Sequence, residues 1–179
     1  MPAITKTTEK SFYALALARI SLGLIFLWAF FDKLFGLGFT TCKTAAMSVV
    51  HTGCSQAWLQ GGSPTVGFLK HATKGPFASL FRNLAGHSWV DYLFMAGLLA
   101  IGVGLLLGIG VKLSVWAGSV MLLLMWAASL WPANNPLLDE HIVYIFVLVA
   151  IGLANAQQKW GLRDWWLKQP VVRNLPLLE

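Results

Sequence analysis

Charged residues are scarce in this chain. Asp, Glu, Lys and Arg make up 11% of its 179 residues, compared with about 25% in ordinary soluble domains, whereas 57% of the residues are hydrophobic. This composition excludes an ordinary soluble domain and predicts a membrane protein. Because a polar side chain inside a membrane is costly, the few polar residues within or beside the apolar segments become the main indicators of function.

Cysteine is also scarce, since the chain has only Cys42 and Cys54. Their spacing excludes the C-x-x-C motif that lowers a thiol pKa. It also fits no standard zinc pattern, so we expect no metal, although a site shared with a loop histidine stays an open alternative. Both cysteines lie in a long segment that we expect on the oxidising side of the membrane, where a structural disulfide is favoured over a redox-active pair.

Acidic residues are absent from the stretch between Leu34 and Val90, which has four basic residues and three histidines. The positive potential of such a segment would attract small anions, and contact with anionic lipid headgroups accounts for it equally well. Nucleic acid is not expected as a partner, because no recognisable binding module accompanies the charge. The candidate contacts for an anion are Lys43, Lys70, Lys74 and Arg82.

Four long apolar stretches fill most of the chain. A membrane span needs about 20 apolar residues, and its backbone polar groups must be paired within the segment, so each stretch is expected to be a helix. We therefore predict an all-α fold, an integral membrane four-helix bundle with a long extracytoplasmic loop that carries short interfacial helices. The predicted parts of this single membrane domain, 1–179, are spans at about 12–36, 90–110, 113–131 and 138–156, an outer loop at about 38–88 and a C-terminal interfacial tail at 157–179.

Basic residues indicate the orientation of this bundle. With four spans, both termini and the turn between the second and third spans share one side of the membrane, which carries seven basic residues against five on the other side. We therefore expect a multi-pass plasma-membrane protein with cytoplasmic N- and C-termini. Within the second span, small residues recur every four positions from Ala96 to Gly108, which favours close helix packing inside the bundle over homo-oligomerisation through this face.

Polar residues are expected to meet at the outer rim of the bundle. His141 and Tyr144 are three residues apart and share a helix face, Asp139 lies near its edge, and Asp32 and Lys33 end the first span. Any bundle has polar helix ends, so a purely structural rim is the alternative. The combination of a histidine with carboxylates favours proton handling, because His titrates near neutral pH and a neighbouring carboxylate tunes it.

Arg19 lies about two turns into the first span. It is expected either to extend its charged end to the inner interface, or to be a buried cation that needs an anionic or carbonyl partner. In both cases we expect its role to be structural, ordering the bundle.

Several of these residues fall in short motifs along the chain. The motifs are Arg19-x3-Gly23, Asp32-Lys33, Trp58-Leu59-x-Gly61-Gly62-Ser63-Pro64-Thr65-x2-Phe68-Leu69, Gly75-Pro76-Phe77 and Asn135-Pro136-x2-Asp139-x-His141-Ile142-x-Tyr144. Together they resemble the DoxX/DoxD family of integral membrane proteins over nearly the whole chain, with the DoxD type as the closer match. The resemblance implies a four-helix membrane subunit of a thiosulfate:quinone oxidoreductase, with quinone as acceptor, tetrathionate as product and a second, separate subunit.

The leading functional prediction is therefore a quinone-linked membrane oxidoreductase subunit, in which the basic loop draws in an anion such as thiosulfate and His141 handles protons together with Asp139 and Tyr144. The alternative is a non-enzymatic membrane scaffold or assembly partner that docks another protein through its outer loop. A small transporter ranks last, because the middles of the second and third spans carry almost no polar side chains.

Overall fold

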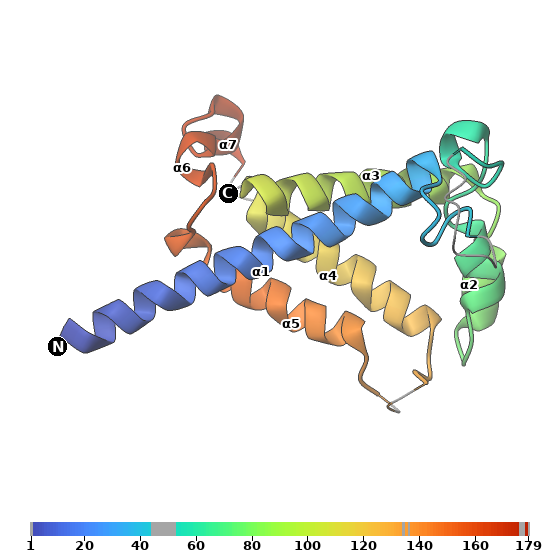
Figure 1. Cartoon of the computed structure of the whole chain (residues 1–179), viewed down its shortest axis with the longest axis horizontal. Coiled ribbons are helices and arrows are strands. Elements are labelled where there is room, and N and C mark those ends of the chain that lie inside the picture. Colours follow the sequence, from blue (N-terminus) through green and yellow to red (C-terminus); the bar gives the residue numbers. More distant parts are fainter. Residues whose placement is uncertain (1, 44–52, 134, 136, 176–177, 179) are drawn as a thin grey trace. The chain divides into compact units, whose positions relative to one another are not determined.

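The computed structural model describes residues 2–43, 53–133, 135, 137–175 and 178 (Figure 1). Every regular element among these residues is a helix, which confirms the all-α prediction. The long helices are α1 (Pro2–Phe35), α3 (Ser88–Leu107), α4 (Val111–Ala128) and α5 (Glu140–Leu153). The short ones are η1 (Trp58–Gln60), η2 (Phe68–Ala72), α2 (Ala78–Asn83), η3 (Asn155–Gln157), α6 (Arg163–Trp166) and α7 (Pro170–Asn174).

Within the described ranges, three helices are long and apolar enough to cross a membrane: the Glu9–Phe35 part of α1, α3 and α4. They correspond to the first three predicted spans and indicate a membrane protein whose helices contact lipid. The fourth predicted span is a helix as well, but α5 has 14 residues. At 1.5 Å per residue this gives a length of about 21 Å, which is shorter than a bilayer core of about 30 Å.

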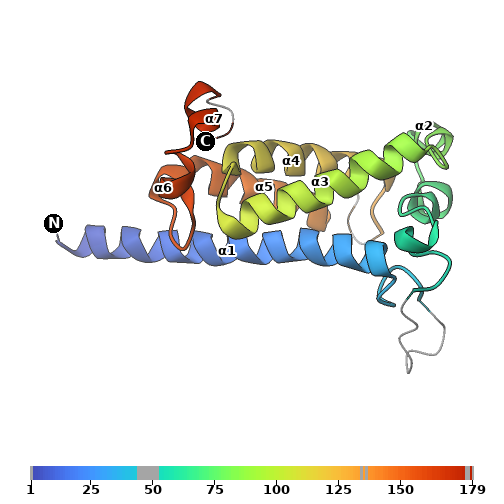
Figure 2. The ribbon, with the colours of Figure 1, turned by 90° about the horizontal axis from the view of Figure 1, so that it is seen from above.

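Residues of the chain fall into two compact units, each described by itself below. The first consists of residues 1–25, 100–123 and 140–179, and the second of 26–99 and 124–139. Figure 2 shows the short helices α6 and α7 of the first unit following α5 along the chain.

In the first unit, α1 and the C-terminal part of α3 approach at Gly23. A Cβ atom on Gly23 would lie 2.8 Å from the backbone nitrogen of Leu106 and 3.0 Å from the carbonyl oxygen of Gly102, so any larger residue would force the helices apart. Small residues allow such close approach in lipid. Gly104, from the predicted small-residue series, packs against the Ser114 hydroxyl of α4 within the same chain.

In the second unit, a small core joins the loop helices to the end of α4. Leu69 of η2, Phe81 of α2 and Ala128 of α4 are buried together, and the backbone N–H of Lys74 donates to the carbonyl of Ala128 at 3.0 Å. Burial of these apolar side chains gives η2 and α2 their stability, because helices of five and six residues are marginal alone.

Candidate functional site

The most polar buried site in the first unit surrounds Arg19. This side chain is 1% exposed. Its Nη1 donates to the carbonyls of Leu105 and, at 3.2 Å, Leu106. Its Nη2 donates to those of Lys159 at 3.1 Å and Trp160 at 2.9 Å. The structure therefore shows a buried cation with carbonyl partners, as in the second of the two predicted alternatives.

Each of these carbonyl oxygens is available to accept a hydrogen bond from a cation. Leu105 and Leu106 are in the last turn of α3, where carbonyls have no intrahelical donor and the helix dipole is negative. Lys159 and Trp160 lie in the irregular segment after η3. Trp160 has a positive φ of 51°, an uncommon conformation for a bulky residue, and the hydrogen bond from Arg19 stabilises it.

Two further hydrogen bonds fasten the same segment to the end of α3. Gln158 Nε2 donates to the carbonyl of Gly108 at 3.0 Å, and the backbone N–H of Leu162 donates to that of Leu107 at 2.8 Å. Gly108 has a φ of 70°, and a Cβ there would lie 2.9 Å from Arg19 Nη1. Glycine is therefore needed both for the left-handed turn and for the approach of the guanidinium.

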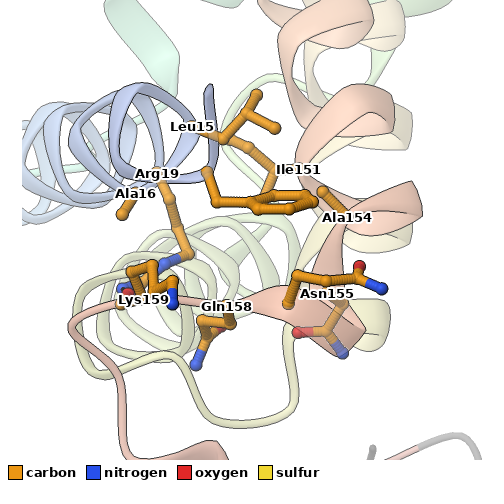
Figure 3. Close-up of a pocket in the computed structure, with 10 residues that line it drawn as sticks. Leu15, Ala16, Arg19, Ile151, Ala154, Asn155, Gln158 and Lys159 are labelled. Carbon is orange, nitrogen blue, oxygen red and sulfur yellow. Dashed lines mark hydrogen bonds between the residues drawn. The ribbon is translucent and has the colours of Figure 1, made fainter. Parts of the chain in front are cut away.

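Beside the guanidinium lies a small cavity of about 20 Å³, drawn in Figure 3 with Arg19 at its edge. Leu15 and Ala16 of α1 and Ile151 of α5 form its apolar wall. Its polar wall includes Arg19, Asn155 and Gln158. The site is chemically mixed, because its lining combines apolar side chains with two basic and three amide residues, Gln157 and Lys159 among them.

In the second unit, Asp32 holds the chain that leaves α1. The side chain is 1% exposed. Its Oδ1 accepts from the backbone N–H of Phe39 at 3.2 Å. Its Oδ2 accepts from the Thr40 N–H at 2.9 Å, the Thr40 hydroxyl at 2.6 Å and the Thr41 N–H at 3.0 Å. Asp32 was predicted as part of a proton-handling rim; here its carboxylate fixes the first residues of the loop.

Lys33 contributes to the same loop start, because its Nζ donates to the Thr40 hydroxyl oxygen at 3.2 Å. The other predicted rim residues belong to a different stretch of chain. Asp139 directly precedes α5, and His141 and Tyr144 lie within its first five residues, one helical turn apart.

Asp91 has a structural role, although the sequence analysis assigned no role to this residue. It lies in the first turn of α3 and is 8% exposed. Its Oδ1 accepts from the hydroxyls of Ser63 at 2.8 Å and Thr65 at 2.5 Å, and from the Thr65 N–H at 3.3 Å. The sequence offered one indication of this role. The hydroxyl groups of the Gly61-Gly62-Ser63-Pro64-Thr65 motif need an acceptor, the loop contains no acidic residue, and Asp91 is the first carboxylate after the motif.

Cys42 and Cys54 form a disulfide with Cα atoms 5.8 Å apart, as predicted. The bond is part of a packed corner, since a Cβ on Gly36 would collide with Cys42 Sγ. The N–H of Cys42 also donates to Gln56 Oε1 at 3.2 Å. The disulfide thereby ties the end of α1 to the residues that precede η1, while residues 44–52 between the cysteines lie outside the described part of the chain.

Three of the four predicted anion contacts belong to η2, α2 and the residues between these two helices. Arg82 Nη2 donates to the Thr73 carbonyl at 3.0 Å, Lys74 is the next residue, and Lys70 lies in η2 just before it. All three are exposed, and we call them the basic surface. Lys43 is exposed too but follows Cys42, outside this group.

No family model, curated protein or solved structure matches the chain.

Proposed function

We propose that this chain is the membrane subunit of a quinone-linked oxidoreductase of the DoxX/DoxD type, which accepts electrons from a small anion such as thiosulfate. The observation that carries the proposal is the basic surface of Lys70, Lys74 and Arg82. These cations lie on a disulfide-bonded loop whose sequence contains no acidic residue to neutralise them, and a surface of one sign raises the local concentration of an oppositely charged substrate.

The quinone half of the reaction takes place beside the membrane helices. His141, with Asp139 and Tyr144, is proposed to supply and accept protons for a bound quinone, because imidazole changes charge near neutral pH. Asp32 and Lys33 then serve by holding the loop start through Thr40. No flavin, haem or iron–sulfur motif occurs in the sequence, so electron transfer is proposed to require a second subunit, and quinone is the only cofactor assigned.

The proposed topology has four crossings, with α5 extended by its flanking residues to complete the fourth. Both termini are then cytoplasmic, and the loop lies outside the plasma membrane. The Cys42–Cys54 disulfide supports this orientation, because disulfides persist on the oxidising side of a membrane. Fusions that fluoresce only in the cytoplasm test it: signal is expected at both termini, and signal from a fusion inserted at Gly67, an exposed residue, contradicts it.

The catalytic proposal is tested by quinone reduction in liposomes that contain the full chain and its co-purifying subunit. Neutralising the basic surface with Lys70→Gln, Lys74→Gln and Arg82→Gln is expected to raise the KM for thiosulfate about 3–10-fold at low ionic strength, with a smaller effect in high salt. The matched control removes three exposed cations elsewhere and is expected to leave KM unchanged. Its substitutions are Lys10→Gln, Lys168→Gln and Arg173→Gln.

The outcome of His141→Ala separates binding from chemistry. A lower kcat for quinone reduction with an unchanged KM for thiosulfate supports the proposed division of roles. Absence of thiosulfate-dependent reduction in the wild-type complex, with every co-purifying subunit present, rejects the enzyme.

A scaffold that docks another protein through residues 38–88 is the second candidate. The observation in its favour is that Arg19, Asp32 and Asp91, the buried charges of the described residues, all hold backbone or loop groups. A partner that co-purifies with the wild type and with His141→Ala, but not with the basic-surface variant, supports this function. Second copies of the chain are distinguished by mass measurement of the purified complex.

A further inference from the structure

The C-terminal tail packs against the end of α3. The backbone N–H of Leu162 donates to the Leu107 carbonyl at 2.8 Å, and Val172 of α7 is 2% exposed, so the tail is folded onto the rest of its unit. A helix of 20 residues such as α3 is about 30 Å long, which matches the thickness of a bilayer core. Its last residues, Leu106 and Leu107, therefore lie where membrane hydrocarbon meets the lipid headgroups, and the tail lies beside them.

An open groove lies between this end of α3 and the tail. Its volume is about 350 Å³, and its lining consists of Leu106, Leu107, Trp160, Gly161 and Leu162. The side chains of this lining are aliphatic or aromatic, and the volume falls in the range of about 300–1,000 Å³ that is typical of small-molecule sites. Trp160 is 58% and Leu162 48% exposed, so the groove is accessible from outside the protein.

The aromatic wall of the groove is held in place by α1. The ring centroids of Trp160 and Tyr13 are 5.2 Å apart, and the Trp160 carbonyl accepts from Arg19 Nη2 at 2.9 Å. A wall that is already positioned loses little conformational freedom when a ligand binds, which favours binding. The groove therefore has a fixed boundary on the side of the tail.

Positive charge accompanies the groove. Residues 157–175 include four basic residues and one acidic residue. Arg163 directly follows the lining residue Leu162, and Lys159 lies just before the lining segment of the tail. The Nζ of Lys159 is 3.9 Å from Glu9 Oε1 of α1, so part of its charge is already compensated. Arg163 is the cation next to the lining that can meet the charge of a ligand.

We propose that this groove binds one anionic phospholipid, with an acyl chain against Leu107 and Leu162 and the headgroup phosphate at Arg163. The apolar lining requires a hydrocarbon chain and the cation requires a negative group. The edge of the bilayer core supplies molecules that have both.

Other ligands match only part of the site. A quinone has an apolar tail but no charge, and a small inorganic anion has a charge but no apolar part. The proposal is independent of the oxidoreductase activity, which assigns its anion to the basic surface and its protons to His141.

Native mass spectrometry of the full chain in detergent micelles, titrated with phosphatidylglycerol or with phosphatidylcholine of the same acyl chains, tests the site. The expected result is one phosphatidylglycerol per chain, bound about fivefold more tightly than phosphatidylcholine, the preference that one cation near a lipid surface provides. Equal affinity for the two lipids overturns the inference. Displacement of phosphatidylglycerol by an equal concentration of a short-chain quinone also overturns it, because the groove would then be a quinone site.

Leu107→Trp tests the apolar part of the site. The larger side chain fills the groove while the backbone carbonyl of residue 107 still accepts from Leu162, so the tightly bound lipid is expected to be lost. Leu99→Trp is the matched control with wild-type binding, because both leucines belong to α3 and are 39% exposed. Unchanged binding in Leu107→Trp, or an equal loss in Leu99→Trp, overturns the inference.

Arg163→Gln tests the charged part. It is expected to weaken phosphatidylglycerol binding about fivefold and to leave phosphatidylcholine binding unchanged, whereas Arg163→Lys keeps the charge and most of the preference. Arg173→Gln removes an exposed cation of the same tail and is expected to change the affinity far less. Equal losses in Arg163→Gln and Arg173→Gln would show diffuse attraction and overturn the single site. If Arg163→Gln does not fold, the comparison of Leu107→Trp with Leu99→Trp decides.

Discussion

Replacing Arg19 by Met is the most informative perturbation of this protein. Met keeps the unbranched stem but removes the guanidinium, so four hydrogen bonds to backbone carbonyls are lost. In soluble proteins, hydrogen bonds to charged groups contribute about 1.5–3 kcal/mol each, which sums to about 6–12 kcal/mol. Hydrogen bonds measured within membrane bundles average about 0.6 kcal/mol, which sums to about 2.4 kcal/mol.

The membrane scale is the better guide, because polar groups freed inside a membrane bundle find other hydrogen-bond partners. We therefore expect Arg19→Met to lower the free energy of unfolding by about 2–6 kcal/mol, with the lower half of this range favoured. Arg19→Lys is expected to lose less, because an ammonium keeps the charge and three donors but lacks the planar fork that reaches two pairs of carbonyls.

Denaturant unfolding of the full chain in detergent micelles measures the loss, and Arg173→Met at an exposed position is the control. Hydrogen exchange shows which part of the chain loses stability. The N–H of Leu162, which donates to Leu107 at the end of α3, should exchange faster when Arg19 no longer holds Lys159 and Trp160. An Arg19→Met protein with the stability and the Leu162 exchange rate of the wild type would refute the structural role of the guanidinium.

Three further changes address the second unit. Asp32→Asn should lower the free energy of unfolding by about 2–4 kcal/mol, because an amide nitrogen faces donors that a carboxylate oxygen accepted; faster proteolysis near Thr40 checks it, and cleavage as slow as in the wild type argues against it. Asp91→Asn should lower the free energy of unfolding by about 1–3 kcal/mol, because a neutral amide oxygen is a weaker acceptor than a carboxylate for the three donors at Oδ1; faster cleavage near Thr65 checks it, and cleavage rates equal to the wild type argue against it. Reducing the Cys42–Cys54 disulfide, with a sequence separation of 12, should cost about 3 kcal/mol by the chain-entropy model, and coincident melting curves with and without reductant would contradict this.

Local composition was sufficient for much of the architecture. Hydrophobic length predicted the α1, α3 and α4 spans, because about 20 apolar residues in a row have few alternatives to a membrane helix. The disulfide was also predictable, since the chain has two cysteines in one loop. The length of α5 was not, because the predicted span at 138–156 included residues at both ends that lie outside the helix, which runs from Glu140 to Leu153.

The candidate sites were less accessible to this reasoning. Asp32 was placed correctly at the end of a span, but its donors at Phe39, Thr40 and Thr41 depend on how the loop turns back. In the same way, no spacing rule indicates that Lys33 bonds to the Thr40 hydroxyl or that Ser63 donates to Asp91. A carboxylate at a helix end has the same sequence signature whether it moves protons or anchors a loop.

The sequence by itself determined that the chain is helical, apolar over membrane lengths, basic and acid-free in its loop, and able to close one disulfide, since each of these follows from residue types and local spacing. Only the tertiary structure decided which groups satisfy the buried charges. Arg19 donates to carbonyls 86 and 141 residues away, and Asp91 accepts from hydroxyls 26 and 28 residues away. Backbone carbonyls are present at every position, so their selection as partners is set by the path of the folded chain and leaves no trace in the sequence.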